Sequence, residues 1–99
     1  MDIAYSIDGV PIRLTGERWL HIVESHDDMA GYYDDVLATI ETPNALLPGH
    51  NGSLIAVRAY GRARYMMVVY RQVTEDDGFI ITAYFSSKID LTRAIWRRQ

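Results

Sequence analysis

The sequence predicts an α+β domain with helices packed on one face of an antiparallel sheet. Two observations predict it. Apolar residues recur at helical spacing in the first half of the chain, and they alternate with polar residues at a period of two in the second half. Helical segments come together and strand segments follow them, an order that favours helices on a strand meander over a parallel α/β sheet. A length of 99 residues leaves room for one domain, over residues 1–99.

The N-terminal segment predicts a hairpin or an extended lead-in. Residues 3–8 and 10–14 are short β-prone runs around Asp8 and Gly9. Asp-Gly between two such runs is a strong hairpin signal. Pro11 has no backbone N–H to donate to a neighbouring strand, so we expect the second run at the edge of the sheet or outside it.

Two helices are predicted next. Thr15 is a suitable N-cap, and the apolar stripe that follows it predicts a first helix over about residues 16–26. A second helix begins at Tyr32 or Tyr33. It ends before Pro43, because the residue before a proline avoids the helical region.

The second half of the chain predicts a meander of three to four strands. Residues 45–47 form a short candidate strand, and residues 53–60 form the next. Residues 64–74 are apolar on both faces and are therefore expected at the centre of the sheet. Residues 78–88 alternate between two faces. The face expected to hold the helices carries Phe79, Ile81, Ala83 and Phe85, and the opposite face carries Ile80, Thr82, Tyr84 and Ser86.

The last segment, residues 90–98, predicts a short C-terminal helix. No segment is then left over to cover the sheet face opposite the helices, so we expect that face to be free.

The charge is divided unevenly along the chain. Residues 1–50 hold two Arg and nine Asp or Glu, whereas residues 51–99 hold seven Arg, one Lys and four Asp or Glu. The halves therefore carry −7 and +4, which gives the net charge of −3. A positive half made of arginine favours a polyanion as partner, because the guanidinium fork matches phosphate. A surface of inter-half salt bridges is the structural alternative.

Several function classes are excluded by what the sequence lacks. It has no cysteine, and so no disulfide framework, no thiolate zinc site and no thiol nucleophile. It has no phosphate-binding loop or dinucleotide fingerprint, and we expect no cofactor. The N-terminus shows no leader, and no apolar run approaches the roughly 20 residues of a membrane span. We expect a cytoplasmic protein with no membrane partner; the oligomeric state is left open.

The first helix carries two histidines, His21 and His26, with Glu24 between them. The spacing differs from that of the zinc-protease helix, because the two histidines lie about 140° apart around the helix axis. They cannot both bind one ion, and we expect no metal site. Histidine is also the proton shuttle of neutral pH. The structural alternative is a solvated His21 and a His26 that interacts with the helix C-terminus.

Arginines and aromatic residues are interleaved along the predicted strands. The arginines are Arg58, Arg62, Arg64 and Arg71, and the tyrosines are Tyr60, Tyr65, Tyr70 and Tyr84. Arginine with aromatic rings on a sheet face is typical of single-stranded RNA recognition. They cannot all share a face, since Arg64 and Tyr70 have one parity and Tyr65 and Arg71 have the other. A basic, β-prone surface without a ligand is the structural alternative.

The chain resembles a known family in the segments "IRLTGERWLHIVESHDDM", "VLATIETP", "LIAVR", "MMVVYRQV" and "GFIITAYFSSKIDLTRAIW". These segments look like the small phage- and toxin-associated branch of the Barnase–EndoU–colicin–RelE (BECR) nuclease superfamily. The resemblance covers about residues 12–97, and its specific part is "ERWLHIVESH" joined to "ITAYF". It implies two helices followed by a four-stranded antiparallel sheet. It also implies metal-independent RNA cleavage, often in a toxin–antitoxin setting.

The resemblance also implies site residues. The helix histidine of the family would be His21 or His26, its strand cation Arg58 and its last-strand hydroxyl Thr82. Tyr84 joins this candidate catalytic set as a partner of the phosphate or of a base. The candidate RNA-binding residues are Arg64, Tyr70, Arg71, Arg93 and Trp96. The sequence thus predicts a ribonuclease that attacks RNA through the ribose 2′-hydroxyl. The alternative is an inactive module that binds RNA or a protein partner such as an antitoxin.

Overall fold

The N-terminal hairpin forms around the predicted Asp-Gly turn in the computed structural model, which describes all 99 residues. Strand β1 (Asp2–Tyr5) pairs antiparallel with β2 (Pro11–Leu14), and Gly9 in the turn has a φ of +80°. The expected edge position of the second run is wrong, because β2 lies between β1 and β6. Pro11 is tolerated since the pairing of β2 with β6 begins only at Ile12.

Both predicted helices are present. Helix α1 spans Gly16–Ser25, and the Thr15 hydroxyl caps it by accepting a hydrogen bond from the Arg18 N–H. A short 3₁₀ turn, η1 (Asp27–Met29), leads to helix α2 (Tyr33–Glu41). Neither helix has the length and apolar character needed to cross a membrane.

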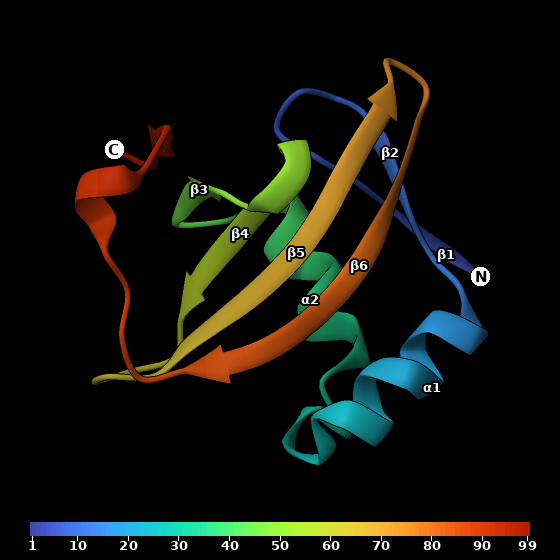
Figure 1. Cartoon of the computed structure of the whole chain (residues 1–99), viewed down its shortest axis with the longest axis horizontal. Coiled ribbons are helices and arrows are strands. Elements are labelled where there is room, and N and C mark those ends of the chain that lie inside the picture. Colours follow the sequence, from blue (N-terminus) through green and yellow to red (C-terminus); the bar gives the residue numbers. More distant parts are fainter.

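The antiparallel meander predicted for the second half of the chain is confirmed. Its strands are β3 (Ala45–Pro48), β4 (Leu54–Ala59), β5 (Tyr65–Thr74) and β6 (Asp77–Ser86). The whole sheet is larger than the meander. It has seven strands in the order β1-β2-β6-β5-β4-β3-β7, and it is mixed, because β2 runs parallel to β6. Figure 1 shows β5 and β6 as long twisted strands with α2 behind them and α1 beside β6.

The C-terminal helix predicted over residues 90–98 is wrong. The chain forms a single 3₁₀ turn, η3 (Leu91–Arg93), and then the two-residue strand β7 (Trp96–Arg97). The Asp90 side chain accepts a hydrogen bond from the Thr92 N–H and so favours one tight turn. The backbone beyond it is then satisfied by pairing with β3, which ends the helical path.

The main core lies between the helices and one face of the sheet, which we call the helix side. It is formed by side chains of α1, α2, η1 and alternate residues of the strands. The fully buried large side chains include Ile12, Leu14, Ile22, Met29, Ile40, Met66, Tyr70 and Ile80. Gly78 lies where β2, β5 and β6 meet, and a Cβ there would lie 2.6 Å from the carbonyl oxygen of Arg71. This close approach requires glycine.

A β-bulge changes which residues of β6 face the helices. Val69 pairs with Thr82, but the next residue, Tyr70, pairs with Ile80, so Ile81 is the extra residue. Ile80 therefore enters the main core, together with the later residues Ala83 and Phe85. The prediction that Phe79 and Ile81 hold the helices is therefore wrong, and so is the prediction that Ile80 faces away from them. Simple alternation cannot reveal the inserted residue.

The face opposite the helices, which we call the open face, is partly covered. The segment after β6 returns over it, and its Ile89 and Ala94 pack on a second small core of Leu47, Val57 and Met67. In Figure 1 this segment is the red chain that runs beside β4 toward β3. The expectation that the whole face is free is therefore wrong, and only the part nearer Arg71 stays uncovered.

Candidate functional site

Six polar side chains line one hollow in the uncovered part of the open face. The hollow has a volume of about 460 Å³. Its polar lining comes from β5 (Arg71), β6 (Thr82 and Tyr84) and the loop after β3 (His50, Asn51 and Ser53). We call it the polar hollow. A guanidinium, two hydroxyls and an imidazole are groups that bind a phosphate and move its protons.

The strand register brings the β5 and β6 members of this set together. Thr82 lies directly across from Val69, and Arg71 follows two residues later on the same face of β5. Tyr84 follows Thr82 by two residues and therefore points to the same side. The bulge at Ile81 keeps Thr82 and Tyr84 on the open face while Ile80 stays in the core.

Helix α1 brings one histidine to this site. Strand β2 pairs with β6 only at Gly78 and Phe79, so the later part of β6 has no strand on that side. The C-terminal end of α1 lies there instead, and the His26 and Tyr84 rings have centroids 5.7 Å apart. Of the two candidate histidines, His26 therefore lies next to the polar hollow, against its residue Tyr84 but outside its lining. His21 is exposed on α1 and does not line the hollow either.

A second histidine, His50, is held at the rim by an unusual loop. The turn η2 (His50–Gly52) contains two consecutive residues with positive φ, 54° at Asn51 and 80° at Gly52. The buried Ser53 hydroxyl fixes the turn by donating a hydrogen bond of 2.8 Å to the His50 carbonyl oxygen. A Cβ on Gly49 would overlap the Ser53 hydroxyl. Left-handed residues of this kind often occur at functional sites.

Sequence reasoning missed His50 as a site residue. Its segment contains Pro48, Gly49, Asn51 and Gly52, a composition that predicts only a loop. The signal that could have found it is a histidine inside an Asn-Gly turn that follows a buried strand. The position of the loop beside β4 and β5 depends on the sheet order, which the sequence does not reveal.

Arg58 does not join the polar hollow. It pairs with Met66, a residue of the main core, and so faces the helix side. Its guanidinium lies 5.8 Å from the centre of the Tyr60 ring. The Tyr60 hydroxyl in turn donates a hydrogen bond of 2.7 Å to Asp35 on α2. Arg58 and Thr82 therefore do not meet, because their side chains leave opposite faces of one sheet.

Two other candidates also belong to the helix side. The Arg64 guanidinium lies 4.0 Å from the centre of the Phe85 ring, in a group of edge-packed rings with Tyr32 and Tyr60. Tyr70 is fully buried in the main core. An RNA contact by Tyr70 is therefore ruled out, since its side chain has no exposed surface.

The C-terminal candidates lie away from the polar hollow. Arg93 lines a smaller hollow of about 200 Å³ beside Lys88 and Met67. Trp96 pairs with Leu46 and packs against the main core. Arg98 stacks on it, with its guanidinium 5.5 Å from the centre of the Trp96 ring. The structure therefore divides the predicted RNA-binding residues among three places.

The electrostatics of the polar hollow favour an anion. The protein has one salt bridge, of 2.9 Å between Arg13 and Asp77, and Arg71 is half-buried without a carboxylate partner. The lining of the polar hollow contains no Asp or Glu. Nowhere in the protein do three or more His, Cys, Asp or Glu side chains come together in a group that could hold a metal ion.

Comparisons with family models, with curated proteins and with solved structures found no match for this chain. The resemblance to BECR nucleases therefore stays a prediction from the sequence segments.

Proposed function

We propose that the protein is an endoribonuclease of the BECR type and that the polar hollow is its active site. The observation that carries the proposal is the contact of His26 with Tyr84. It joins His26 of "ERWLHIVESH" to Tyr84 of "ITAYF", and Tyr84 lines the same hollow as Thr82 and Arg71, an arginine that has no acidic partner. The resemblance of these sequence segments to BECR nucleases supports the same reaction class.

Arg71 takes the phosphate-binding role expected for Arg58. It lines the hollow with Thr82, and the apolar wall there consists of Val69 on the same strand and Ile55 on the neighbouring β4. A half-buried guanidinium held on a strand is preorganised to stabilise charge that develops on the phosphate oxygens. The Thr82 hydroxyl donates a hydrogen bond to the same phosphate.

Two histidines flank the phosphate position, His26 beyond Tyr84 and His50 at the opposite rim. One imidazole removes the proton from the ribose 2′-hydroxyl. The 2′-oxygen then bonds to phosphorus, and the bond from phosphorus to the 5′-oxygen breaks. The other, protonated imidazole gives its proton to the leaving 5′-oxygen. The products are a 2′,3′-cyclic phosphate end and a free 5′-hydroxyl, and this path needs no metal or cofactor.

Cleavage of a labelled RNA in EDTA tests the proposal. The parent protein should produce 2′,3′-cyclic phosphate ends, and His26→Ala should cleave about 10²–10⁴-fold more slowly because a positioned acid or base is lost. His21→Ala is the matched control, since it removes an exposed histidine of the same helix. If His26→Ala cleaves as fast as the parent, the assignment of the site is wrong. RNA binding without cleavage would favour the non-catalytic module.

A further inference from the structure

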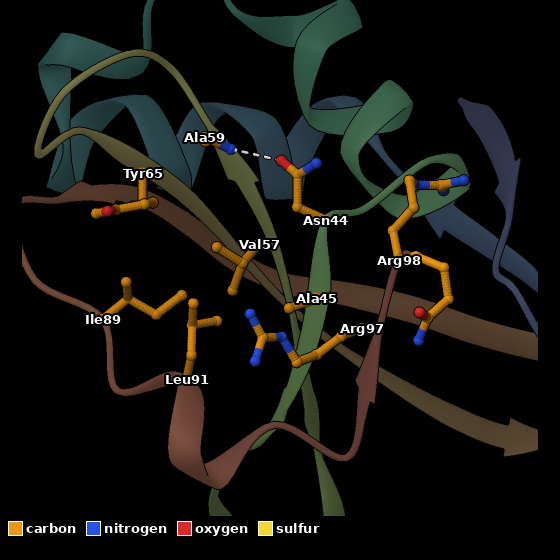
Figure 2. A pocket seen from close by; sticks show the side chains of 10 residues that line it. Asn44, Ala45, Val57, Ala59, Tyr65, Ile89, Leu91, Arg97 and Arg98 are labelled. Carbon is orange, nitrogen blue, oxygen red and sulfur yellow. Dashed lines mark hydrogen bonds between the residues drawn. The ribbon is translucent and has the colours of Figure 1, made fainter.

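A second hollow lies on the open face, toward the other end of β5, with a volume of about 360 Å³. Its walls come from strands β3, β4 and β5 on one side and from the C-terminal segment on the other. They include Ala45, Val57, Ala59, Tyr65, Leu91 and Arg97. We call it the arginine hollow. Figure 2 shows Arg97 reaching from β7 into the space bounded by Val57 and Leu91.

The charge in the arginine hollow is positive and unpaired. The Arg97 side chain makes no hydrogen bond and no salt bridge, and the lining contains no Asp or Glu. Its neighbour Arg98 differs, because the Arg98 Nε donates a hydrogen bond of 3.0 Å to the Pro43 carbonyl oxygen. Arg97 is therefore the group available to an anion. A guanidinium binds phosphate through two parallel hydrogen bonds.

The remaining walls suit a flat ring. Ala45, Val57 and Leu91 are apolar, and Tyr65 supplies an aromatic ring at one end. A volume of about 360 Å³ lies within the range of small-molecule sites. The rest of the lining is polar, with Asn44, Arg98 and Gln99. Apolar walls, an aromatic ring and the unpaired Arg97 match a nucleotide, which has a stacking base and a phosphate.

We propose that the arginine hollow binds one nucleotide of the RNA strand that the polar hollow cleaves, so this inference rests on the proposed function. The two hollows share one face of β5. Tyr65 lines the arginine hollow and Val69 lines the polar hollow. These residues lie about 13 Å apart along the strand, a span that a few nucleotides can cover. The arginine hollow is thus a subsite that favours single-stranded RNA over a dinucleotide.

Nucleotide binding tests this subsite directly. The probes are adenosine 5′-monophosphate, adenosine and inorganic phosphate, followed by NMR shifts of the Val57 and Leu91 methyl groups. We expect the nucleotide to bind about tenfold more tightly than either part alone, because the base and the phosphate have separate contacts. Equal binding of the nucleotide and inorganic phosphate would overturn the proposal.

Two variants and a control locate the binding. Arg97→Gln removes the cation and should weaken nucleotide binding about tenfold. Ala59→Leu fills the hollow from an exposed position at the end of β4 and should weaken binding without a change of charge. Arg62→Gln, at an exposed turn outside the hollow, removes the same charge and should bind as the parent does. Parent-like binding by both hollow variants contradicts the assignment.

Cleavage kinetics separate this inference from the proposed function. Arg97→Gln should raise KM for RNA of eight or more nucleotides by about tenfold with kcat unchanged, because only ground-state binding is lost. A dinucleotide should be cleaved equally well by both proteins. If the parent cleaves no RNA, the proposed function fails, while the nucleotide titration still decides whether the arginine hollow is a binding site.

Discussion

The two faces of the sheet are built from the same strands and differ in almost every physical property. Along β5, Met66, Val68 and Tyr70 are buried under the helices. The residues between them point to the open face, which carries the polar hollow and an arginine without a carboxylate partner. The helix side supplies stability through apolar burial. The open face leaves charge and hydroxyls accessible, as a binding surface requires.

The largest effect is expected from substitutions at the bulge, where two neighbouring isoleucines lie on opposite faces of the sheet. Ile80 is 1% exposed in the main core, whereas its neighbour Ile81 lines the polar hollow. Ile80→Ala should lower the free energy of unfolding by about 2–5 kcal/mol, as for other large-to-small core changes. Ile81→Ala, a matched deletion, should cost clearly less. Urea unfolding of both variants measures the difference. Equal losses would contradict the assignment of Ile80 and Ile81 to opposite faces.

This bulge marks the limit of what the sequence predicts. Alternation over residues 78–88 correctly indicates a two-faced strand, and the order of elements correctly indicates an α+β fold. One extra residue reverses the faces of Phe79 and Ile81, and such an insertion leaves no mark in the hydrophobic pattern. Local periodicity therefore predicts the elements better than it predicts which side chains meet.

The candidate site was predictable only in part, for a related reason. Thr82, Tyr84 and Arg71 are candidates from the sequence and line one hollow, while their roles stay predictions. Arg58 lies on the other face because strand register, a long-range property, sets its side. His50 belongs to the hollow through a loop whose position depends on the neighbours of β3.

Arginines on the two faces of the sheet should differ in their contribution to RNA cleavage. Arg71→Gln should reduce RNA cleavage about 10²-fold or more, because it removes preorganised charge from the phosphate position. Arg58→Gln should change cleavage only slightly, since Arg58 lies beside Tyr60 on the helix side. Single-turnover cleavage rates of the two variants provide the measurement. A larger loss with Arg58→Gln would move the phosphate site to the helix side.

The helix side should also set the stability at high pH. Burial, followed by a hydrogen bond to Asp35, raises the pKa of Tyr60 to about 12. Burial and a hydrogen bond to Asp2 likewise raise the pKa of Tyr33 to about 12. An unfolded tyrosine ionises near pH 10. The folded state therefore favours the neutral phenol, and this stabilisation is complete below pH 10 and lost as the pH rises toward 12.

Urea unfolding at pH 8, 10, 11 and 12 measures this loss. The free energy of unfolding should fall over that interval in the parent protein. Tyr60→Phe should start lower at pH 8, because the hydrogen bond to Asp35 is gone, and should then fall less steeply. A parallel decline in the two proteins would show that Tyr60 does not contribute.

The smallest effect is expected for Tyr70, whose side chain is fully buried on the helix side and therefore cannot contact RNA. Its hydroxyl is buried without a hydrogen-bond partner, and burial raises its pKa to about 12. An unpaired buried hydroxyl costs free energy, so Tyr70→Phe should leave the free energy of unfolding unchanged or raise it by up to about 1 kcal/mol. RNA binding, measured by fluorescence anisotropy, should be that of the parent.

Tyr84→Phe is the matched comparison, because it removes a hydroxyl from the open face and should weaken RNA binding while stability is kept. If instead Tyr70→Phe weakened RNA binding and Tyr84→Phe did not, the open face would lose its role as the binding surface.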